Sequence, residues 1–455
     1  MFESDLEVVM DYPMDYMHQE LLQRLESIRV NINWESGNER IEFPKNLCDI
    51  FRPEEIDWLL IEEAKTKDRS PFFRLPLDEI LIRSGYRDEP EVDEDGRPLL
   101  RRTTALLWVA KHKLSTDNCK IKIRNLFAIY DRFDVNYSDD FGWTHFHVAC
   151  MHGLDEVVGK FLELGQDPDC RPRERDASTI DPPLHLALKH KQKRIFELLL
   201  RRGASPNLAD AEGLTPLHII CMNSCDDHDL VRILFDISEE QNQHVQLDAR
   251  DKLGWTPLHL ALNFGNKKVA ESLLRSGADP NLPNAKGSTP LHVICNKSYE
   301  NYMAMTFFRT IGVIQEAVNV DAQDELGDTP LHLASRCGNK KKVEILLRNG
   351  ADPNLSNNEG STPLHVICKR LECHNDDLAK LFFKINNENR RFVQVDAVDN
   401  LDRTPLQWAV ANLFPNAIDV WTTGPICPAS YFQPRFISAR RSNQSSMKLL
   451  FVILN

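Results

Sequence analysis

The sequence predicts an all-α solenoid, in which helix-turn-helix units joined by hairpin-like connectors stack side by side. A heptapeptide, Thr-Pro-Leu-His-Leu-Ala-Leu at residues 256–262, recurs in near-copies along the last three quarters of the chain. Spacings of 33 residues alternate with spacings of about 40. One such unit cannot bury its apolar stripe alone, so neighbours must share a core. The units begin at Arg102, Gly142, Ile180, Gly213, Gly254, Gly287, Gly327, Gly360 and Asp402.

Residues 1–100 form an acidic N-terminal region, which we expect to be mainly helical and to cap the stack. They carry 12 Lys and Arg against 25 Asp and Glu, so the whole net charge of −13 belongs to them. Residues 53–65 have a Pro-led, acid-rich first turn and helical apolar spacing, and residues 21–30 form a second predicted helix. Residues 88–96 read as an exposed acidic linker, or alternatively as a docking site for a basic partner.

Each repeat unit carries its own helix signals. Thr256 is a good N-cap and Pro257 suits the first helical position, where its missing N–H would be unpaired. Gly265-Asn266 then ends this first helix. Apolar residues at helical spacing predict a second helix that ends at Gly277. The polar, Gly-containing segment that follows predicts an extended, hairpin-like connector.

These motifs resemble the ankyrin repeat family, whose Gly-x-Thr-Pro-Leu-His start and Gly-Ala-Asp-x-Asn end are matched closely at 254–286 and 327–359. The resemblance covers about residues 102–420, so we expect a repeat domain of eight to nine units over 101–421. It implies L-shaped units, with connectors that project as fingers and a concave groove between the fingers and the first helices.

Short and long units differ in charge and length. Short units carry basic runs where the second helix begins, including 189–194, 266–268 and 339–342, whereas long units carry acidic residues there. Lysine opposes the helix dipole at that end, so helix stability does not explain the runs. They form either a solvated face or a surface that orients a partner. We expect most extra residues of the long units, such as 237–245 and 386–391, to project after the second helix.

The C-terminal end departs from the repeat. The last unit should continue into a Leu-rich second helix, but from Thr422 the sequence follows no repeat logic. We expect residues 422–455 to be an irregular tail, an alternative end of the chain that leaves the last unit frayed.

No catalytic or cofactor motif stands out, so no enzyme activity, cofactor or metal is expected. Cys150, Cys221, Cys295 and Cys368 share one repeat position and are predicted core thiols, because a free Cys behaves as a small hydrophobe. Cys221 with Cys225, or Cys368 with Cys373 and His374, lacks paired zinc-ligand spacing. A row of histidines, each three residues after the Thr position of its unit, is expected to bond the Thr hydroxyl: His147, His185, His218, His259, His292, His332 and His365.

The resemblance assigns partner contact to two sets of positions. One set falls late in the first helix, here Asn263 and Phe264 in one unit and Arg336 and Cys337 in another, and the other is the residue before each Thr. The residue before each Thr lies at the base of a finger in the family, and Trp143 and Trp255 occupy that position here although the core does not require them. Tryptophan is enriched at interaction hot spots, although each ring could instead pack on the neighbouring finger. Trp255 and Phe264 would then make one apolar patch. The expected partner-binding residues are Trp143, Trp255, Asn263, Phe264, Asp328, Arg336 and Arg403.

We therefore predict a monomeric, intracellular module, cytoplasmic or nuclear, that binds an unidentified protein as a scaffold, adaptor or inhibitor. The acidic start of the chain reads as no secretory signal, and the longest apolar run, 449–454, is too short to cross a membrane. Two alternatives remain: the substrate reader of a modifying enzyme, with activity in residues 1–100 or in a partner, and a nucleic-acid-associated regulator. A neutral solenoid suits phosphate backbones poorly, and no small-molecule substrate is expected.

Overall fold

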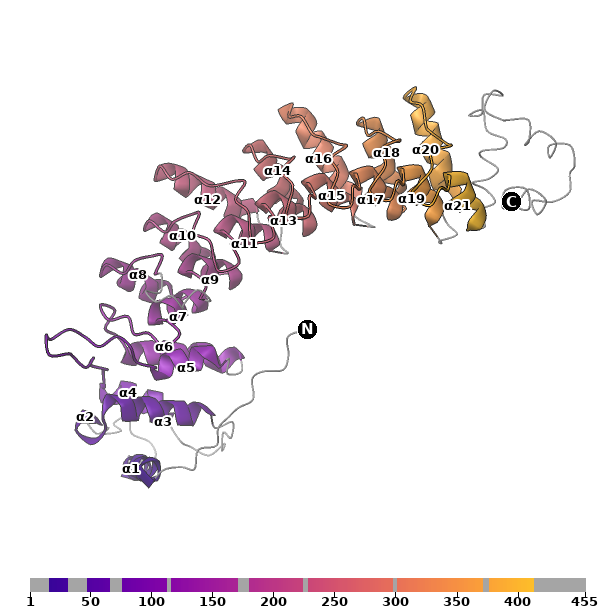
Figure 1. The fold of residues 1–455 in the computed structure, drawn as a ribbon. Coiled ribbons are helices and arrows are strands. Elements are labelled where there is room, and N and C mark those ends of the chain that lie inside the picture. Colours follow the sequence, from indigo (N-terminus) through magenta and orange to yellow (C-terminus); the bar gives the residue numbers. More distant parts are fainter. Residues whose placement is uncertain are drawn as a thin grey trace, which may run out of the picture. The chain divides into compact units, whose positions relative to one another are not determined.

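In the residues that it describes, the computed structural model consists of helices joined by turns and loops, and the predicted fold class is confirmed (Figure 1). In those residues β-structure is limited to isolated bridges. The chain divides into two compact units, residues 1–211 and 212–455. The structure describes residues 16–31, 47–65, 76–112, 116–170, 180–223, 228–297, 301–370 and 376–412.

The first unit begins with the N-terminal helices. Helix α3 coincides with the predicted helix at 53–65, and α1 contains the one predicted at 21–30. Helix α3 packs on α5, and α4 packs on α6, as first and second helices do in the repeats that follow. The helices are α1 (Tyr16–Asn31), α2 (Leu47–Ile50), α3 (Pro53–Lys65), α4 (Leu77–Ser84), α5 (Ala105–Lys111), α6 (Thr116–Ile129), α7 (His145–His152), α8 (Asp155–Glu163), α9 (Pro183–Lys189) and α10 (Lys193–Arg201).

A buried polar cluster joins α3 to the first repeat. The Arg102 guanidinium donates to Asp57 at 2.8 Å and to Asp88 at 3.0 Å, and the Tyr137 hydroxyl donates to Asp88 at 2.7 Å. Burial raises the pKa of Asp57, although the charge of Arg102 and a hydrogen bond from Tyr130 oppose that rise. A buried ion pair is costly to break, because one charge is then left without a partner. The cluster therefore fixes the α3–α4 pair against the repeats.

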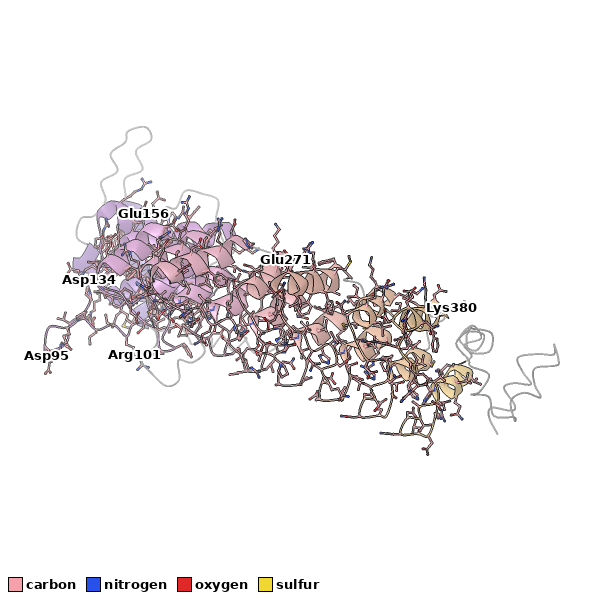
Figure 2. The ribbon with its side chains drawn as sticks, turned by 90° about the horizontal axis from the view of Figure 1, so that it is seen from above. Asp95, Arg101, Asp134, Glu156, Glu271 and Lys380 are labelled. Atoms are coloured by element: carbon pink, nitrogen blue, oxygen red, sulfur yellow. The ribbon has the colours of Figure 1, made fainter. Side chains whose placement is uncertain are left out.

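The segment at 88–96 differs in part from its prediction as an exposed linker. Asp88 is buried, since its carboxylate bonds Arg102 and Tyr137. Residues 91–99 form a small hairpin, closed by Leu99 N–H to the Glu91 carbonyl at 2.8 Å. Its exposed acidic tip, with Asp95, projects from the helices in Figure 2.

The second unit repeats the helix pair in strict order. First helices pack in the series α11, α13, α15, α17, α19 and α21, and second helices in the series α12, α14, α16, α18 and α20. Each first helix begins at the predicted Pro, behind a Thr N-cap. The helices are α11 (Pro216–Met222), α12 (His228–Glu240), α13 (Pro257–Asn263), α14 (Lys267–Arg275), α15 (Pro290–Cys295), α16 (Asn301–Ile314), α17 (Pro330–Arg336), α18 (Lys340–Arg348), α19 (Pro363–Lys369), α20 (Asp376–Glu388) and α21 (Pro405–Ala411).

The extra residues of the long units lie mainly within their second helices, so the prediction that they follow those helices is wrong in part. Helices α12, α16 and α20 have 13 or 14 residues, against nine in α14 and α18. Ile237 in α12 and Asn386 in α20 are buried. An additional helical turn satisfies its own backbone groups and packs on its neighbours, whereas a projecting loop would not.

Two lysines of one basic run make contacts within the stack of repeats. Lys342 is fully buried and donates to the Ile294 carbonyl at 2.8 Å and to the Lys297 carbonyl. Lys340 pairs with Asp377 of the next unit at 3.1 Å. Lys342 therefore bonds the end of a neighbouring first helix, so for this residue both readings, a solvated face and a surface that orients a partner, are wrong.

The repeat cysteines are confirmed as core thiols: Cys150, Cys221, Cys295 and Cys368 are free and buried. Burial raises the pKa of the Cys295 and Cys368 thiols to about 12. No helix in the described ranges is both long and apolar enough for a membrane crossing. Cys225, Cys373, His374 and the predicted tail at 422–455 lie outside the described residues.

Candidate partner-binding surface

The repeat histidines hold each unit together and join it to the next. In the repeat unit that begins at Gly327, the His332 Nδ1 accepts from the Thr329 N–H at 3.1 Å, so the proton of the neutral ring is on Nε2. Nε2 then donates to the Ser361 carbonyl of the following unit at 2.9 Å. Burial lowers the pKa of His332, and it lowers that of His259 to about 4. The rings are neutral near pH 7.

The predicted bond to the Thr hydroxyl is confirmed for His147, His218, His259, His292, His332 and His365. At His185 the prediction is wrong, because Pro182 replaces the Thr and has no hydroxyl. The bond to the next unit is an addition that the structure reveals. Nε2 bonds link His218 to Trp255, His259 to Ser288, His292 to Asp328, His332 to Ser361 and His365 to Arg403, at 2.9 to 3.1 Å in each case.

The accepting carbonyl always belongs to the residue before the Thr, which we call the finger-base position. An Asp or Asn four residues earlier builds the turn that holds it. In one finger the Asp251 carboxylate accepts from the Leu253 and Trp255 N–H groups, at 2.9 and 2.8 Å, and the Asp251 N–H bonds the Trp255 carbonyl at 3.0 Å. The finger-base residue is therefore fixed on both sides, and its side chain has a defined place.

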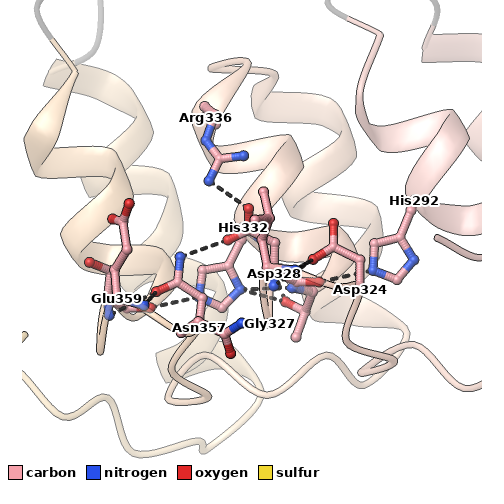
Figure 3. Close-up of polar contacts among 12 residues, drawn as sticks. His292, Asp324, Gly327, Asp328, His332, Arg336, Asn357 and Glu359 are labelled. Carbon is pink, nitrogen blue, oxygen red and sulfur yellow. Dashed lines mark hydrogen bonds and ion pairs between the residues drawn. The ribbon is translucent and has the colours of Figure 1, made fainter. Parts of the chain in front are cut away.

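In three repeat units the finger-base residue bonds the residue seven places after the Thr position, at the end of the first helix, which we call the helix-end position. Asp328 bonds Arg336 at 2.6 Å, Ser361 bonds Lys369 at 2.8 Å, and in the first unit Asp181 bonds Lys189 at 2.6 Å. Asp328 and Arg336 are predicted from the sequence as separate contact positions, and the structure brings them together (Figure 3).

Asp328 and Arg336 have different roles in that pair. The Asp328 side chain is 1% exposed and also accepts from Asn357 Nδ2 at 2.7 Å, whereas the Arg336 side chain is 49% exposed. A surface molecule can reach the guanidinium but not the carboxylate. Asp328 thus positions Arg336, and the accessible charge at this point is positive (Figure 3).

The apolar residues lie two repeat units earlier, in the unit that begins at Gly254. The Trp255 ring is half-buried and packs edge-on against His259 of its own unit, with ring centroids 5.7 Å apart. Asn263 ends α13, and Phe264 follows as its C-cap, 46% exposed. Trp255 and Phe264 are therefore two partly exposed apolar points, and the single patch that the sequence predicts from them stays a prediction.

Trp143, in the compact unit formed by residues 1–211, is arranged in the same way as Trp255. Its half-buried ring packs edge-on against His147 of its own unit, with centroids 5.8 Å apart. In both cases the ring contact is with the repeat histidine and leaves part of the indole accessible.

A cation–aromatic cluster completes the surface at α21. Arg403 lies 4.6 Å and Lys369 4.9 Å from the centroid of the Trp408 ring, and Trp408 Nε1 donates to Asp399 at 2.7 Å. Burial alone would raise the pKa of Asp399, but the hydrogen bonds from Trp408, from the Arg403 backbone and from Lys369 hold it at about 2. The carboxylate stays ionised and buried beneath the cations.

Sequence reasoning found Arg403 but missed Trp408, Asp399 and Lys369. The signal was available for Trp408, which stands four residues after its Thr, where the neighbouring unit has Val366. A Trp at a position that is otherwise aliphatic marks a place where the packing differs.

The comparisons with known proteins concern the repeats. A family model described as ankyrin repeats (3 copies) matches residues 184–284, 273–357 and 343–420. The B-cell lymphoma 3 protein homolog of Mus musculus is 32% identical over 239 residues, which are 51% of this chain and 49% of that protein. Rabankyrin-5 of Mus musculus is 35% identical over 184 residues, 40% of this chain and 14% of that protein. This chain therefore spans at most about half the length of these relatives.

The chain is also similar to another curated protein and to a solved structure. The nuclear factor NF-kappa-B p105 subunit of Gallus gallus is 26% identical over 310 residues, 65% of this chain and 30% of that protein. A crystal structure of the ankyrin repeat domain of Bcl-3, described as a unique member of the IkappaB protein family, is 30% identical with a TM-score of 0.43, covering 50% of this chain and 94% of that one.

Proposed function

Because the chain belongs to the ankyrin repeat family, we propose that it binds another protein through its finger-base and helix-end positions, as a scaffold, adaptor or inhibitor without catalysis of its own. The observation that carries the proposal is the arrangement of charge in the second unit. The carboxylates of Asp328 and Asp399 are each 1% exposed, while Arg336 beside the first of them is half exposed. Arg403, over Trp408, is exposed as well.

This arrangement favours one kind of partner surface. The Asp328 carboxylate holds Arg336, and Arg403 lies over the Trp408 ring, which Asp399 holds by a hydrogen bond. Little side-chain entropy is therefore lost when a ligand binds these cations. Arg offers a planar donor set that matches a carboxylate. We propose that acidic side chains of the partner meet Arg336 and Arg403, and that apolar ones meet Trp255 and Phe264.

We further propose that residues 101–421 form the repeat domain and that residues 1–100 include its N-terminal cap, since α3 and α4 pack as a repeat does. An intracellular location, cytoplasmic or nuclear, agrees with buried free thiols, because oxidising compartments favour disulfides.

The experiment is proximity labelling in cells with the full chain as bait, followed by mass spectrometry. Trp255→Ala with Phe264→Ala removes the apolar points, and Arg336→Ala with Arg403→Ala removes the cations. A matched control, Met305→Ala with Val313→Ala, removes exposed apolar side chains of α16, 51% and 59% exposed. We expect the first two baits to lose a shared set of neighbours that the control retains.

Each bait is first checked by circular dichroism, so that an unfolded variant is not mistaken for one that fails to bind. If folded Trp255 and Arg336 variants recover the same neighbours as the unchanged chain, these positions do not hold the partner and the proposal fails.

A further inference from the structure

The fingertips of the second compact unit, residues 212–455, carry a regular residue pattern that has no part in partner binding at the finger bases. The tip residue stands directly before the Gly, or before Asp402, at which each unit begins. Charged residues and leucines alternate there. In order along the stack the tip residues are Glu212, Leu253, Lys286, Leu326, Glu359 and Leu401.

The three leucines are among the most exposed large apolar side chains of the protein. Leu253 is 66%, Leu326 58% and Leu401 64% exposed. Exposing one leucine is ordinary for a soluble protein, but a regular row of them marks an interaction site.

Backbone hydrogen bonds set the spacing of this row. Each tip carbonyl accepts an N–H from the next finger at about the same length: Glu212 from Lys252 at 3.0 Å, Leu253 from Ala285 at 3.0 Å, Lys286 from Glu325 at 2.9 Å, Leu326 from Asn358 at 3.0 Å and Glu359 from Asn400 at 2.9 Å. The tips are therefore evenly stepped, and alternate tips are roughly 20 Å apart if each helix layer is about 10 Å thick.

The approach of neighbouring fingers explains why glycine follows the tips. At Gly327, whose φ is +71°, a Cβ would lie 2.7 Å from the Asn358 backbone nitrogen. A side chain there would push the fingers apart and disturb the spacing.

The order of these residues is self-complementary about Leu326. Reversing the row exchanges Leu253 with Leu401 and Lys286 with Glu359, and it leaves Leu326 in place. We propose that the fingertips of two copies of this chain meet antiparallel around a two-fold axis at Leu326. Leucine then meets leucine, and each Lys286 meets Glu359 of the other copy. A two-fold interface requires this kind of self-complementary patch.

The charged tips are available for these contacts. Lys286 has no ion-pair partner within the described ranges. The Glu359 side chain is 74% exposed; it lies 3.5 Å from Lys369, which has closer partners in Ser361 at 2.8 Å and Asp399 at 3.2 Å. Glu359 can therefore pair with a lysine of a second copy.

The same geometry makes the association weak. A stable interface uses about 20–30 residues a side, and the fingertips offer far fewer. Glu325, which is next to Leu326, would also face Glu325 of the other copy across the axis, and like charges repel. We expect a dissociation constant on the order of 100 μM, so the chain is monomeric in dilute solution, as the sequence suggests, and dimeric where it is concentrated.

Sedimentation velocity of the full chain between about 1 μM and 1 mM measures this. Leu326→Ser should weaken association about tenfold or more, and Glu325→Gln should strengthen it. Lys286→Glu alone places Glu against Glu, and Glu359→Lys alone places Lys against Lys. Each should weaken self-association, whereas an equimolar mixture of the two variants restores both pairs in a heterodimer at least about tenfold tighter than either homodimer.

Val313→Ser on α16 and Lys380→Glu on α20 serve as matched controls away from the fingertips, and both should leave association unchanged. Circular dichroism verifies that every variant is folded. A chain that stays monomeric at about 1 mM overturns the proposal, and so does association that Leu326→Ser leaves intact. Mixed charge variants that fail to associate more tightly than the separate ones would show that the charges do not pair as proposed.

Discussion

The link between units through the repeat histidine can be tested with one substitution, His332→Gln. The last described unit shows what glutamine does at this position: the Gln407 side chain accepts from the Thr404 N–H at 2.8 Å, so it preserves the helix cap. It would not reproduce the imidazole bond from His332 Nε2 to the Ser361 carbonyl of the next unit. The substitution therefore separates the local cap from the link.

The expected loss follows from burial. His332 and Ser361 are both 0% exposed, so water cannot replace the missing donor. The Ser361 carbonyl keeps its bond from the Asn357 N–H at 3.0 Å, so the substitution removes one of its two hydrogen bonds. One intramolecular hydrogen bond contributes about 0.5–1.5 kcal/mol. We expect His332→Gln to lower the free energy of unfolding by about 1 kcal/mol at pH 7, within that range.

Urea titration monitored by circular dichroism and tryptophan fluorescence measures the change, provided that the slope with denaturant is preserved. Gln407→Ala is the matched control: Gln407 is exposed and only its cap bond is lost, at a cost of about 1 kcal/mol or less. A stability within about 0.5 kcal/mol of the unchanged chain for His332→Gln would refute the role of the link, since that is the usual range for an unimportant surface change.

Three further outcomes follow. The free energy of unfolding should fall as the pH is lowered from about 6.5 to 4, because unfolded histidines bind protons that the native His259, with a pKa of about 4, does not; urea midpoints between about pH 7 and 8 should be nearly constant. Asn266→Ala should lower stability by about 2–3 kcal/mol, measured by urea titration, because buried Asn266 Nδ2 donates to the Cys221 and Asn223 carbonyls at 2.8 and 2.7 Å. Arg102→Ala should cost about 3–5 kcal/mol by leaving buried acids unpaired, and hydrogen exchange should show the loss in α3 while α17 stays protected.

Local chemistry made much of the fold predictable. Thr and Pro at the starts of the first helices, and a left-handed glycine such as Gly277 with φ +98°, act within a few residues of themselves. Lys342 shows what local patterns cannot supply. Its burial depends on carbonyls 45 and 48 residues earlier in the chain, and within its own run it resembles any solvent-facing lysine.

The candidate surface was predictable to a similar extent. The family pattern identified Asp328 and Arg336 as positions of interest, but only their contact shows that the carboxylate is buried and the guanidinium accessible. Asp399 could not be found from its neighbours in sequence, because it acts through Trp408, nine residues later, across a turn.

The histidine links have a direction, and this bears on how the protein is made. Each ring bonds a carbonyl that lies 29 to 38 residues further along the chain, never one that precedes it. During synthesis, a unit of the second half can complete its hydrogen bonds only after the ribosome has added the start of its successor. Assembly would then follow translation with a lag of one repeat, each newly emerged finger locking the helix pair made just before it.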